Sequence, residues 1–467
     1  MRAEADAPLA DARRWDAQLA TLHATAALHA GRAAEPAAAQ QARRWLIDTL
    51  GCAIAGRHAA EVRRFEAAMA ALEPSGAFRF PDGPAMGVLG AAQLIAMAAT
   101  WDEACEGHAL AHGRPGVPLI AALWPLALQR GATLAQFVDA FVLGYEVGAR
   151  AGAWLRIRPG MHVDANWPAL GVAAGVARLL GLDAAGIVQA IDIAACQLAA
   201  SLYLPVASGR TARNTYLAHS ALLGLQAAFA SAAGIDAPAD ALAHYASAHA
   251  AASVQPLPGP EATLLLDAYL KPFAAVRHVH YGAVAAQRLR ERLHADTSVI
   301  RAIELTIYEE ATVYCGNRAP RTPIQAQFSL SFGLAAMLRF GVLDPSVYTP
   351  ERFGDAELRR LEALVVLRID PALSARGERG ATLALTHDGG HLGETVHTIA
   401  GDAGHPLDRA ALLAKFTHYA ARSVADDRAA SFCDTVLDSA DIDLRLLWQQ
   451  LAPAPLAIPS PTTSPRP

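Results

Sequence analysis

Lysine is almost absent from this 467-residue sequence. Of its 39 basic residues, only Lys271 and Lys415 are lysines, and the other 37 are arginines. Because arginine stays protonated whereas lysine can change its protonation state, a retained lysine indicates a position that needs a compact, titratable ammonium group. Lys271 fits that interpretation. For Lys415, which lies at the start of a helix-period segment, packing or a surface role is the simpler interpretation.

Cysteines are few and scattered. The five cysteines are an odd number with no C-x-x-C pair, which argues against a disulfide framework and a thiolate metal site and indicates a reducing compartment. The first 16 residues contain no apolar signal-peptide core, and no apolar run approaches the roughly 20 residues needed to cross a bilayer. We therefore expect a soluble, cytoplasmic protein with no membrane partner.

Signatures of nucleotide and nucleic-acid binding are also missing. No G-x-G-x-x-G follows a predicted strand, and no Walker loop or G-x-S-x-G elbow occurs. The net charge of −5 leaves no broad basic face for phosphate backbones. Four histidines invite a metal interpretation, but they straddle a predicted turn without a matching carboxylate framework, so solvated hairpin residues are the better explanation. They are His387, His391, His397 and His405. We expect no cofactor, no metal and no nucleic-acid partner.

Alanine is what the sequence has in abundance, with 108 residues in a chain that is 53% hydrophobic. Alanine and leucine recur at three- to four-residue spacing from residue 13 to about 267, which predicts a succession of helices. At one junction, Gly181 is expected to end a helix at Leu180, and Asp183 is expected to cap the next one.

A second type of pattern occupies residues 268–405. Four segments there are predicted as strands, namely 303–308, 364–369, and then 382–386 and 395–399 on either side of the hairpin signal Asp388-Gly389-Gly390. Helical patterning returns at 406–452, and the Pro/Ser/Thr-rich tail 453–467 is expected to be disordered. The sequence thus predicts a mainly α protein with a smaller α+β domain, inserted between helical segments 1–267 and 406–452 that share one core.

Ionisable residues gather in loops between the predicted helices, where functional side chains are often displayed. The first loop, residues 101–116, contains Glu103 and Arg114, and its alternative is a solvated connection. The second loop, residues 158–167, places His162 before a long helix. A helix N-terminus favours the neutral imidazole that a general base needs, although a simple N-capping loop is the alternative.

Two further groups extend this set. Arg210, Arg213 and Tyr216 precede an apolar helix, and guanidinium groups suit a carboxylate-bearing substrate because they bind carboxylates in a bidentate manner. An ordinary surface turn is the alternative there. The last group lies in two later parts of the sequence: Lys271 with His280, then Tyr314 with Arg318.

With these residues in view, the sequence resembles the MmgE/PrpD family, which includes 2-methylcitrate dehydratase, cis-aconitate decarboxylase and iminodisuccinate epimerase. The resemblance covers nearly the full length, through segments 45–51, 144–150, 160–162, 173–183 and 325–330 and through Lys415-Phe416. It implies a helical domain built from both chain ends, a smaller α+β lid, an active site between them and, usually, a homodimer.

Five site positions match the family pattern. His162 is similar to the histidine of the family's G-F-H turn, and Lys271 matches the lysine of the lid. His280 matches the histidine that follows this lysine, and Tyr314 and Arg318 fit a tyrosine–arginine stretch. The resemblance implies that these residues belong to the active site.

At other site positions the sequence departs from the family. Glu103 stands for an aspartate, and Arg114 stands for the histidine before a proline. Arg213 and Tyr216 replace the lysine and the histidine of one motif, and Val276 stands where the decarboxylase type has a histidine. Arg213 keeps the charge of a lysine but gives up easy proton transfer.

The activities of the family share acidic substrates and a transition state with carbanion or enolate character beside a carboxylate, which needs cations and a base. We therefore expect a cofactor-independent, dehydratase-like lyase that removes water, rather than carbon dioxide, from a small di- or tricarboxylate. His162 is the expected general base, and Lys271, Tyr314 and Tyr216 are the other expected catalytic residues. The expected substrate-binding residues are Glu103, Arg114, Arg210, Arg213, His280 and Arg318.

Two alternatives remain open at the level of the sequence. An epimerase of an amino or imino dicarboxylate needs two acid/base groups on opposite faces of one carbon. His162 is a candidate for one of them, and Tyr216 or Lys271 is a candidate for the other. A non-catalytic family member that binds an anionic metabolite is the other alternative, because several ionisable positions have changed.

Overall fold

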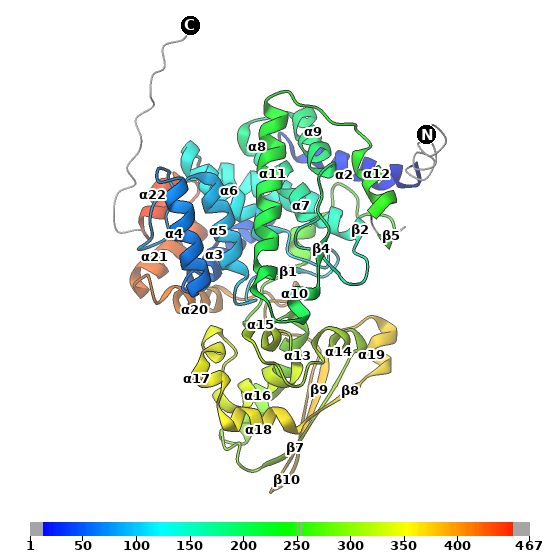
Figure 1. Cartoon of the computed structure of the whole chain (residues 1–467), viewed down its shortest axis with the longest axis vertical. Coiled ribbons are helices and arrows are strands. Elements are labelled where there is room, and N and C mark those ends of the chain that lie inside the picture. The colour runs from blue at the N-terminus through cyan, green and yellow to red at the C-terminus, as the bar shows by residue number, and fades with distance from the viewer. Residues whose placement is uncertain (1–12, 250, 253–254, 452–467) are drawn as a thin grey trace.

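The computed structural model describes residues 13–249, 251–252 and 255–451. It has two parts (Figure 1): a larger helical part, and a smaller part in which helices cover a four-stranded sheet. The prediction of a mainly α protein with a smaller α+β portion is confirmed. The tail expected to be disordered, residues 453–467, lies outside the described residues.

The helical part is formed by both ends of the chain. Its N-terminal elements are η1 (Arg13–Trp15), α2 (Asp16–His29), α3 (Pro36–Gly56), α4 (Ala60–Leu72), α5 (Val88–Thr100), α6 (Gly116–Arg130), α7 (Leu134–Trp154), α8 (Pro168–Leu180), α9 (Ala184–Ala195), α10 (Leu204–Ala207), η2 (Thr211–Thr215), α11 (Tyr216–Ala232), α12 (Ala241–His249) and η3 (Leu264–Asp267). The C-terminal helices are α20 (Arg409–Ala420), α21 (Asp426–Asp438) and α22 (Leu444–Gln449). In Figure 1 these orange and red helices lie beside the blue helices α3 and α4, and α20 and α21 pack against α3.

The junction between α8 and α9 has the predicted form. Gly181 follows Leu180 in the left-handed conformation, with φ of 86°, and its N–H bonds to carbonyl groups of the last helical turn. This conformation is open to glycine because glycine has no Cβ. The carboxylate of Asp183 then accepts a hydrogen bond from the N–H of Gly186 at 2.9 Å and caps α9. Both sequence signals are confirmed.

Short strand pairs fasten the loops of the helical part to one another. They are β1 (Gly107–His108) with β6 (Ala268–Tyr269), β2 (Leu155–Arg156) with β5 (Ala251–Ala252), and β3 (Met161–His162) with β4 (Ser201–Leu202), all antiparallel. The first pair brings the loop after α5 alongside the segment that leads into the smaller part. Residues far apart in the sequence are thereby held at one place.

The smaller part contains a mixed sheet. Its strands are β7 (Ile300–Ile307), β8 (Val365–Ile369), β9 (Ala381–His387) and β10 (Gly390–Val396), in the order β10-β9-β7-β8 with only β7 and β8 parallel. Its helices are α13 (Arg277–Arg292), α14 (Glu309–Cys315), α15 (Pro323–Gln327), α16 (Leu330–Phe340), η4 (Pro345–Tyr348), α17 (Pro350–Phe353), α18 (Ala356–Leu364) and α19 (Pro371–Arg376). Alternating residues of β7, such as Ile303, Leu305 and Ile307, are buried, as a sheet with one covered face requires.

The predicted hairpin exists, but its second strand starts earlier than expected. Gly390 pairs with His387, so a two-residue turn, Asp388-Gly389, joins β9 directly to β10. The predicted strand over 395–399 therefore overlaps the observed strand β10 only at its first two residues. The tight turn sets the register, and pairing ends where Val396 meets Ala381.

Over the described residues, no group of three or more His, Cys, Asp and Glu residues is placed to hold a metal ion.

No helix among the described residues is both long and apolar enough to cross a membrane.

Candidate active site

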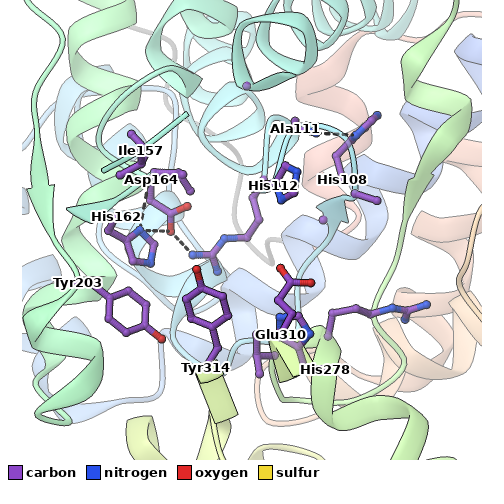
Figure 2. A pocket seen from close by; sticks show the side chains of 18 of the residues that line it. His108, Ala111, His112, Ile157, His162, Asp164, Tyr203, His278, Glu310 and Tyr314 are labelled. Carbon is purple, nitrogen blue, oxygen red and sulfur yellow. Dashed lines mark hydrogen bonds and ion pairs between the residues drawn. The ribbon is translucent and has the colours of Figure 1, made fainter. Parts of the chain in front are cut away.

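A cavity of about 510 Å³ lies where the two parts of the molecule meet. Loops of the helical part line one side of it, and residues from the start of α13, from α14 and from the segment before β9 line the other (Figure 2). Six of the ten predicted site residues line this cavity: Glu103, Arg114, His162, Arg213, Lys271 and Tyr314.

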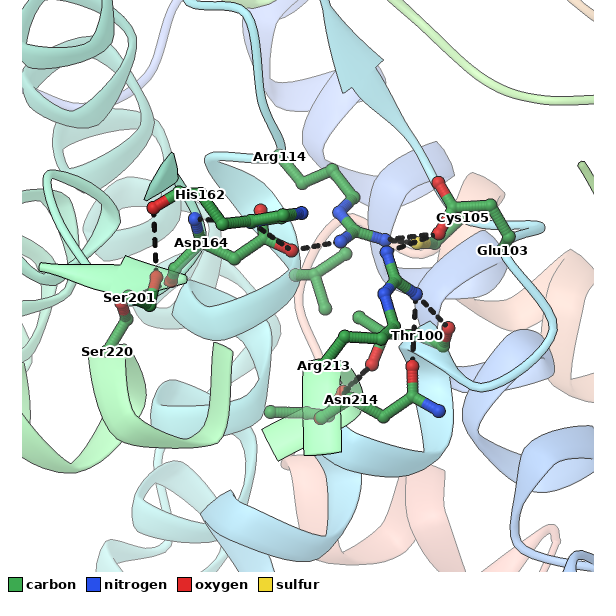
Figure 3. A network of polar contacts seen from close by, with 12 residues as sticks. Thr100, Glu103, Cys105, Arg114, His162, Asp164, Ser201, Arg213, Asn214 and Ser220 are labelled. Carbon is green, nitrogen blue, oxygen red and sulfur yellow. Dashed lines mark hydrogen bonds and ion pairs between the residues drawn. The ribbon is translucent and has the colours of Figure 1, made fainter. Parts of the chain in front are cut away.

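Glu103 is the centre of the polar network in the cavity wall. Its carboxylate accepts a hydrogen bond from Lys271 Nζ at 2.7 Å. It also accepts hydrogen bonds from Arg213 Nη2 at 2.7 Å and from Arg114 Nη1 at 3.1 Å (Figure 3). Lys271 Nζ also donates to the main-chain carbonyl of Glu103 at 3.0 Å. The predicted cations therefore converge on one carboxylate.

The network carries a net positive charge. Arg114 also donates to the carboxylate of Asp164, so three cations face two carboxylates and one positive charge is left over. Burial by itself would raise the pKa of Glu103, but Arg114, Lys271 and Arg213 hold it well below its usual value. The cluster is thus charged at neutral pH and has room for one more negative charge.

The backbone at Glu103 is unusual. Its φ is 53°, in the left-handed region that side chains other than glycine rarely adopt. The contacts of its carboxylate and of its carbonyl group with Lys271 hold this conformation. A strained residue at the centre of a polar cavity is typical of functional sites.

Glu106, a second carboxylate of the same loop, has different surroundings. Glu106 accepts hydrogen bonds from the N–H of Val117 at 2.8 Å, from the N–H of Gly116, from Trp45 Nε1 and from the Tyr145 hydroxyl. Burial raises its pKa to about 7. Although it lines the cavity, its oxygens are committed to the N-terminus of α6, which favours a negative group there.

His162 has a well-defined orientation. It is the last residue of β3, directly before the turn that leads to α8, and its Nδ1 accepts a hydrogen bond from the N–H of Asp164 at 3.2 Å. Burial lowers the pKa of His162 to about 4, and the guanidinium groups of Arg213 and Arg114 act in the same direction. The neutral ring must then carry its proton on Nε2. In this tautomer Nε2 is a donor, and the general-base role of His162 stays a prediction.

A row of four aromatic rings continues from His162 along the cavity. The ring of His162 stacks on Tyr203 at 6.0 Å, Tyr203 meets Tyr314 edge-on at 6.0 Å, and Tyr314 stacks on His278 at 6.1 Å (Figure 2). Two rings come from the helical part and two from the smaller part. An imidazole group therefore stands at each end of the row.

Tyr203 and His278 were not among the predicted site residues. Burial lowers the pKa of His278 to about 3, and its Nδ1 lies 2.6 Å from the hydroxyl of Tyr308. His278 falls in the same short segment as His280, so the sequence contained a signal but did not say which of the two histidines faces the cavity. Tyr203 has no such signal, because it lies in an otherwise apolar segment.

Four predicted residues lie outside the cavity lining. His280 is fully buried, and its Nε2 bonds to the Ala275 carbonyl at 2.9 Å. Arg318 donates to the Ala363 carbonyl, Arg210 is exposed, and the Tyr216 hydroxyl donates to the Leu202 carbonyl at 2.9 Å. Tyr216 remains close behind His162, with ring centres 5.5 Å apart.

Further cations surround the cavity. Arg156, Arg158, Arg277 and Arg379 line it together with His112. Burial lowers the pKa of His112 to about 4, and Arg156 and Arg379 reinforce that shift, so both guanidinium groups lie within electrostatic reach of His112. These four arginines were not among the predicted site residues.

Two family models match the sequence in succession. The MmgE/PrpD N-terminal domain matches residues 18–256, and the MmgE/PrpD C-terminal domain matches residues 273–439. The chain belongs to the MmgE/PrpD family. Members of the MmgE/PrpD family are generally dehydratase-like lyases and isomerases. A comparison with curated proteins gives no significant match.

The two MmgE/PrpD matches include most, but not all, of the predicted residues that line the cavity. His162 and Arg213 fall within the N-terminal match and Tyr314 within the C-terminal one, whereas Lys271 lies in the interval between the two. The C-terminal match also extends beyond the sheet into α20 and α21, which pack on α3 of the helical part. The MmgE/PrpD C-terminal domain therefore contributes to both parts of the molecule.

Proposed function

We propose that the protein is a cofactor-independent, dehydratase-like lyase that acts on a small di- or tricarboxylate. The observation that carries the proposal is the positively charged Glu103 network, which shares one cavity with two neutral imidazoles, His162 and His278. Family membership supports the same reaction class.

The charge of the cavity supports a substrate with more than one carboxylate. The Glu103 network retains one positive charge and can hold one carboxylate beside the reacting carbon. Arg156, Arg158 and Arg379 line the same cavity and offer charge-assisted hydrogen bonds to a second carboxylate. Cations at these positions also stabilise the negative charge that develops when a proton leaves the carbon next to a carboxylate.

The tautomers of the two imidazoles divide the proton transfers between them. We assign the removal of the substrate proton to His278 in the tautomer whose Nδ1–H donates to the Tyr308 oxygen 2.6 Å away, since that tautomer leaves the Nε2 lone pair free. His162, whose Nδ1 is occupied by the N–H of Asp164, donates a hydrogen bond from Nε2 to the substrate. This is a change of role from the general base predicted for His162.

Lys271 is the proposed acid for the departing hydroxyl group. Two of its three N–H bonds point to Glu103, and among the described residues the third has no partner. The carbon–hydrogen electron pair becomes the new double bond, His278 holds the proton, and hydroxide leaves with a proton from Lys271 as water. Proton transfer from His278 back to Lys271 restores both groups, so no cofactor is required.

One observation favours an epimerase as the second candidate. Epimerisation at a carbon next to a carboxylate needs two proton-transferring groups on opposite faces of the substrate. His162 comes from the helical part and His278 from the smaller part, so a substrate between the two parts has an imidazole on each side. Arg213, which cannot readily give up a proton, is compatible with either reaction.

Nuclear magnetic resonance in deuterium oxide tests both candidates. The protein is incubated with malate, citrate, 2-methylcitrate and aspartate, and proton exchange and alkene formation are followed together. The lyase predicts an alkene signal that grows as substrate is lost. Exchange with inversion and without alkene would replace the lyase by the epimerase. Binding without exchange for every acid would leave only the anion-binding alternative.

A further inference from the structure

The second lysine of the chain, Lys415, is buried against the back of the candidate site. Its side chain is 9% exposed, and its Nζ forms an ion pair with Asp48 on α3. Nζ also donates to the carbonyl groups of Ala104 at 2.8 Å and of Lys271 at 2.7 Å. The surface role considered for Lys415 from its sequence position is therefore wrong, because every N–H of the ammonium group is engaged in the interior.

The two carbonyl contacts join the segments that build the Glu103–Lys271 ion pair. Ala104 is the residue after Glu103, and Lys271 is itself one of the two acceptors. Lys415 thus binds the main chain of both segments, while Lys271 and Glu103 bind each other through their side chains at 2.7 Å. The two contacts close a ring of interactions that fixes the distance between these segments.

The chemistry of lysine suits this position. An ammonium group has three N–H bonds in a compact tetrahedral arrangement, and here three acceptors surround it: Asp48 Oδ1 and two main-chain oxygens. A planar guanidinium group is larger and places its donors in a fork. In a chain with 37 arginines, the geometry explains why this cation is a lysine.

The packing of α20 on α3 brings Lys415 to this place. A Cβ atom on Gly51 would lie 3.0 Å from the ring of Phe416, so the absence of a side chain at Gly51 lets α20 approach. Asp48 and Gly51 lie one turn apart on α3, and Lys415 and Phe416 are neighbours on α20. Segments from the two ends of the chain therefore meet through these two contacts.

We propose that Lys415 is a positioning residue, which holds the main chain at Ala104 and Lys271 so that Glu103 and Lys271 meet in the geometry the reaction needs. Its catalytic consequence rests on the proposed function. The three contacts of Lys415, which we call the clamp, are a property of the folded chain and can be measured separately from activity.

A matched control comes from another buried ion pair. Arg57 and Glu66 have side chains that are 3% and 5% exposed, with Arg57 Nε 2.8 Å from Glu66 Oε1. Arg57 also donates to a main-chain carbonyl, that of Pro81, at 2.7 Å. It does not line the cavity. Arg57→Met therefore removes a comparable ion pair without touching the segments around Ala104 and Lys271.

The experiment compares Lys415→Met with Arg57→Met by amide hydrogen–deuterium exchange, denaturation and steady-state kinetics. Both variants are expected to lose stability. Only Lys415→Met is expected to speed exchange at least about 10-fold in peptides covering residues 101–106 and 268–271, and to lower kcat more than it raises KM. Equal exchange at these peptides in the two variants would overturn the clamp. Exchange does not depend on turnover, so it decides this point even if the proposed reaction fails.

Lys415→Gln provides a second variant in case Lys415→Met does not fold. An amide retains donors for the carbonyl groups of Ala104 and Lys271 but carries no charge. Exchange and kcat intermediate between the wild type and Lys415→Met are expected. Exchange at wild-type rates in a folded Lys415→Gln, together with wild-type kcat, would count against positioning through the three contacts.

Discussion

At position 213 a guanidinium group stands where, by the resemblance, the family pattern has a lysine. Arg213 donates to Glu103, to the Thr100 carbonyl at 3.2 Å and to Asn214 Oδ1 at 3.0 Å, and it lies over the ring of Phe328. A lysine could not reach all of these acceptors at once. Arg213 therefore contributes a positive charge and several hydrogen bonds to the network, and other residues have to transfer protons.

Substitution by glutamine is expected to affect kcat/KM differently at His162 and at His278. His162→Gln keeps an N–H donor and should retain kcat/KM within about 10-fold, whereas His162→Ala should lose about 100-fold or more. His278→Gln removes the proposed proton acceptor and should lose at least about 100-fold. Steady-state kinetics on the substrate identified by magnetic resonance measures all three.

His58→Gln serves as the control for these variants. His58 is half-buried, its pKa is also lowered to about 4 by burial, and it lies outside the cavity lining. Its substitution should leave kcat/KM unchanged. A His162→Gln variant as inactive as His278→Gln would return His162 to the role of proton-transferring base.

At the scale of elements, the close approach of α3 to α5 fixes the position of the end of α5, where the loop that carries Glu103 begins. A Cβ atom on Gly56 would lie 2.0 Å from the Ala98 carbonyl oxygen and 2.9 Å from Trp101 Cβ. Main-chain atoms cannot give way as a flexible side chain can, so the end of α5 has to move if Gly56 is changed. That end leads directly into the Glu103 loop.

Gly56→Ala is therefore expected to lower the free energy of unfolding by about 1–3 kcal/mol, as overpacking does, and to lower kcat as well. Gly31→Ala is the control, since a Cβ atom on Gly31 would meet nothing within 4 Å. It should change stability by less than about 0.5 kcal/mol. Chemical denaturation and kinetics on the two variants check this, and equal stability for both would contradict the close approach.

At the scale of the whole molecule, the site lies where segments far apart in the chain come together. β1 pairs with β6, α20 packs on α3, and the start of α13 closes the far side of the cavity. Burial at this junction keeps several histidines neutral: the pKa is lowered to about 4 for His112 and His162 and to about 3 for His278.

This burial predicts how stability depends on pH. An unfolded histidine binds a proton near pH 6.5, whereas folded His162 does so only near pH 4, so its contribution to stability is present above pH 6.5 and is lost as the pH falls to 4. The wild type should therefore lose up to about 3 kcal/mol more than His162→Gln between pH 7 and pH 4.

Denaturation midpoints of the wild type and of His162→Gln, measured between pH 7 and pH 4, give this difference in stability. Asp102 and Glu106, whose pKa values burial raises to about 7, change stability in the opposite direction. Their contribution is the same in both proteins and cancels in the comparison. A stability difference that does not depend on pH would mean that folded His162 titrates like an unfolded histidine.

The sequence by itself determined the mainly helical composition, the helix ends at Gly181 and Asp183, the hairpin and the loops that hold ionisable residues, because these depend on local spacing and turn chemistry. Only the tertiary structure decided which charges meet. It placed Lys271, Arg114 and Arg213 on Glu103, turned the Nδ1 of His162 to the N–H of Asp164, and buried Lys415 beneath both segments. Such contacts join residues up to several hundred positions apart, and neither periodicity nor composition carries information about the distance between them.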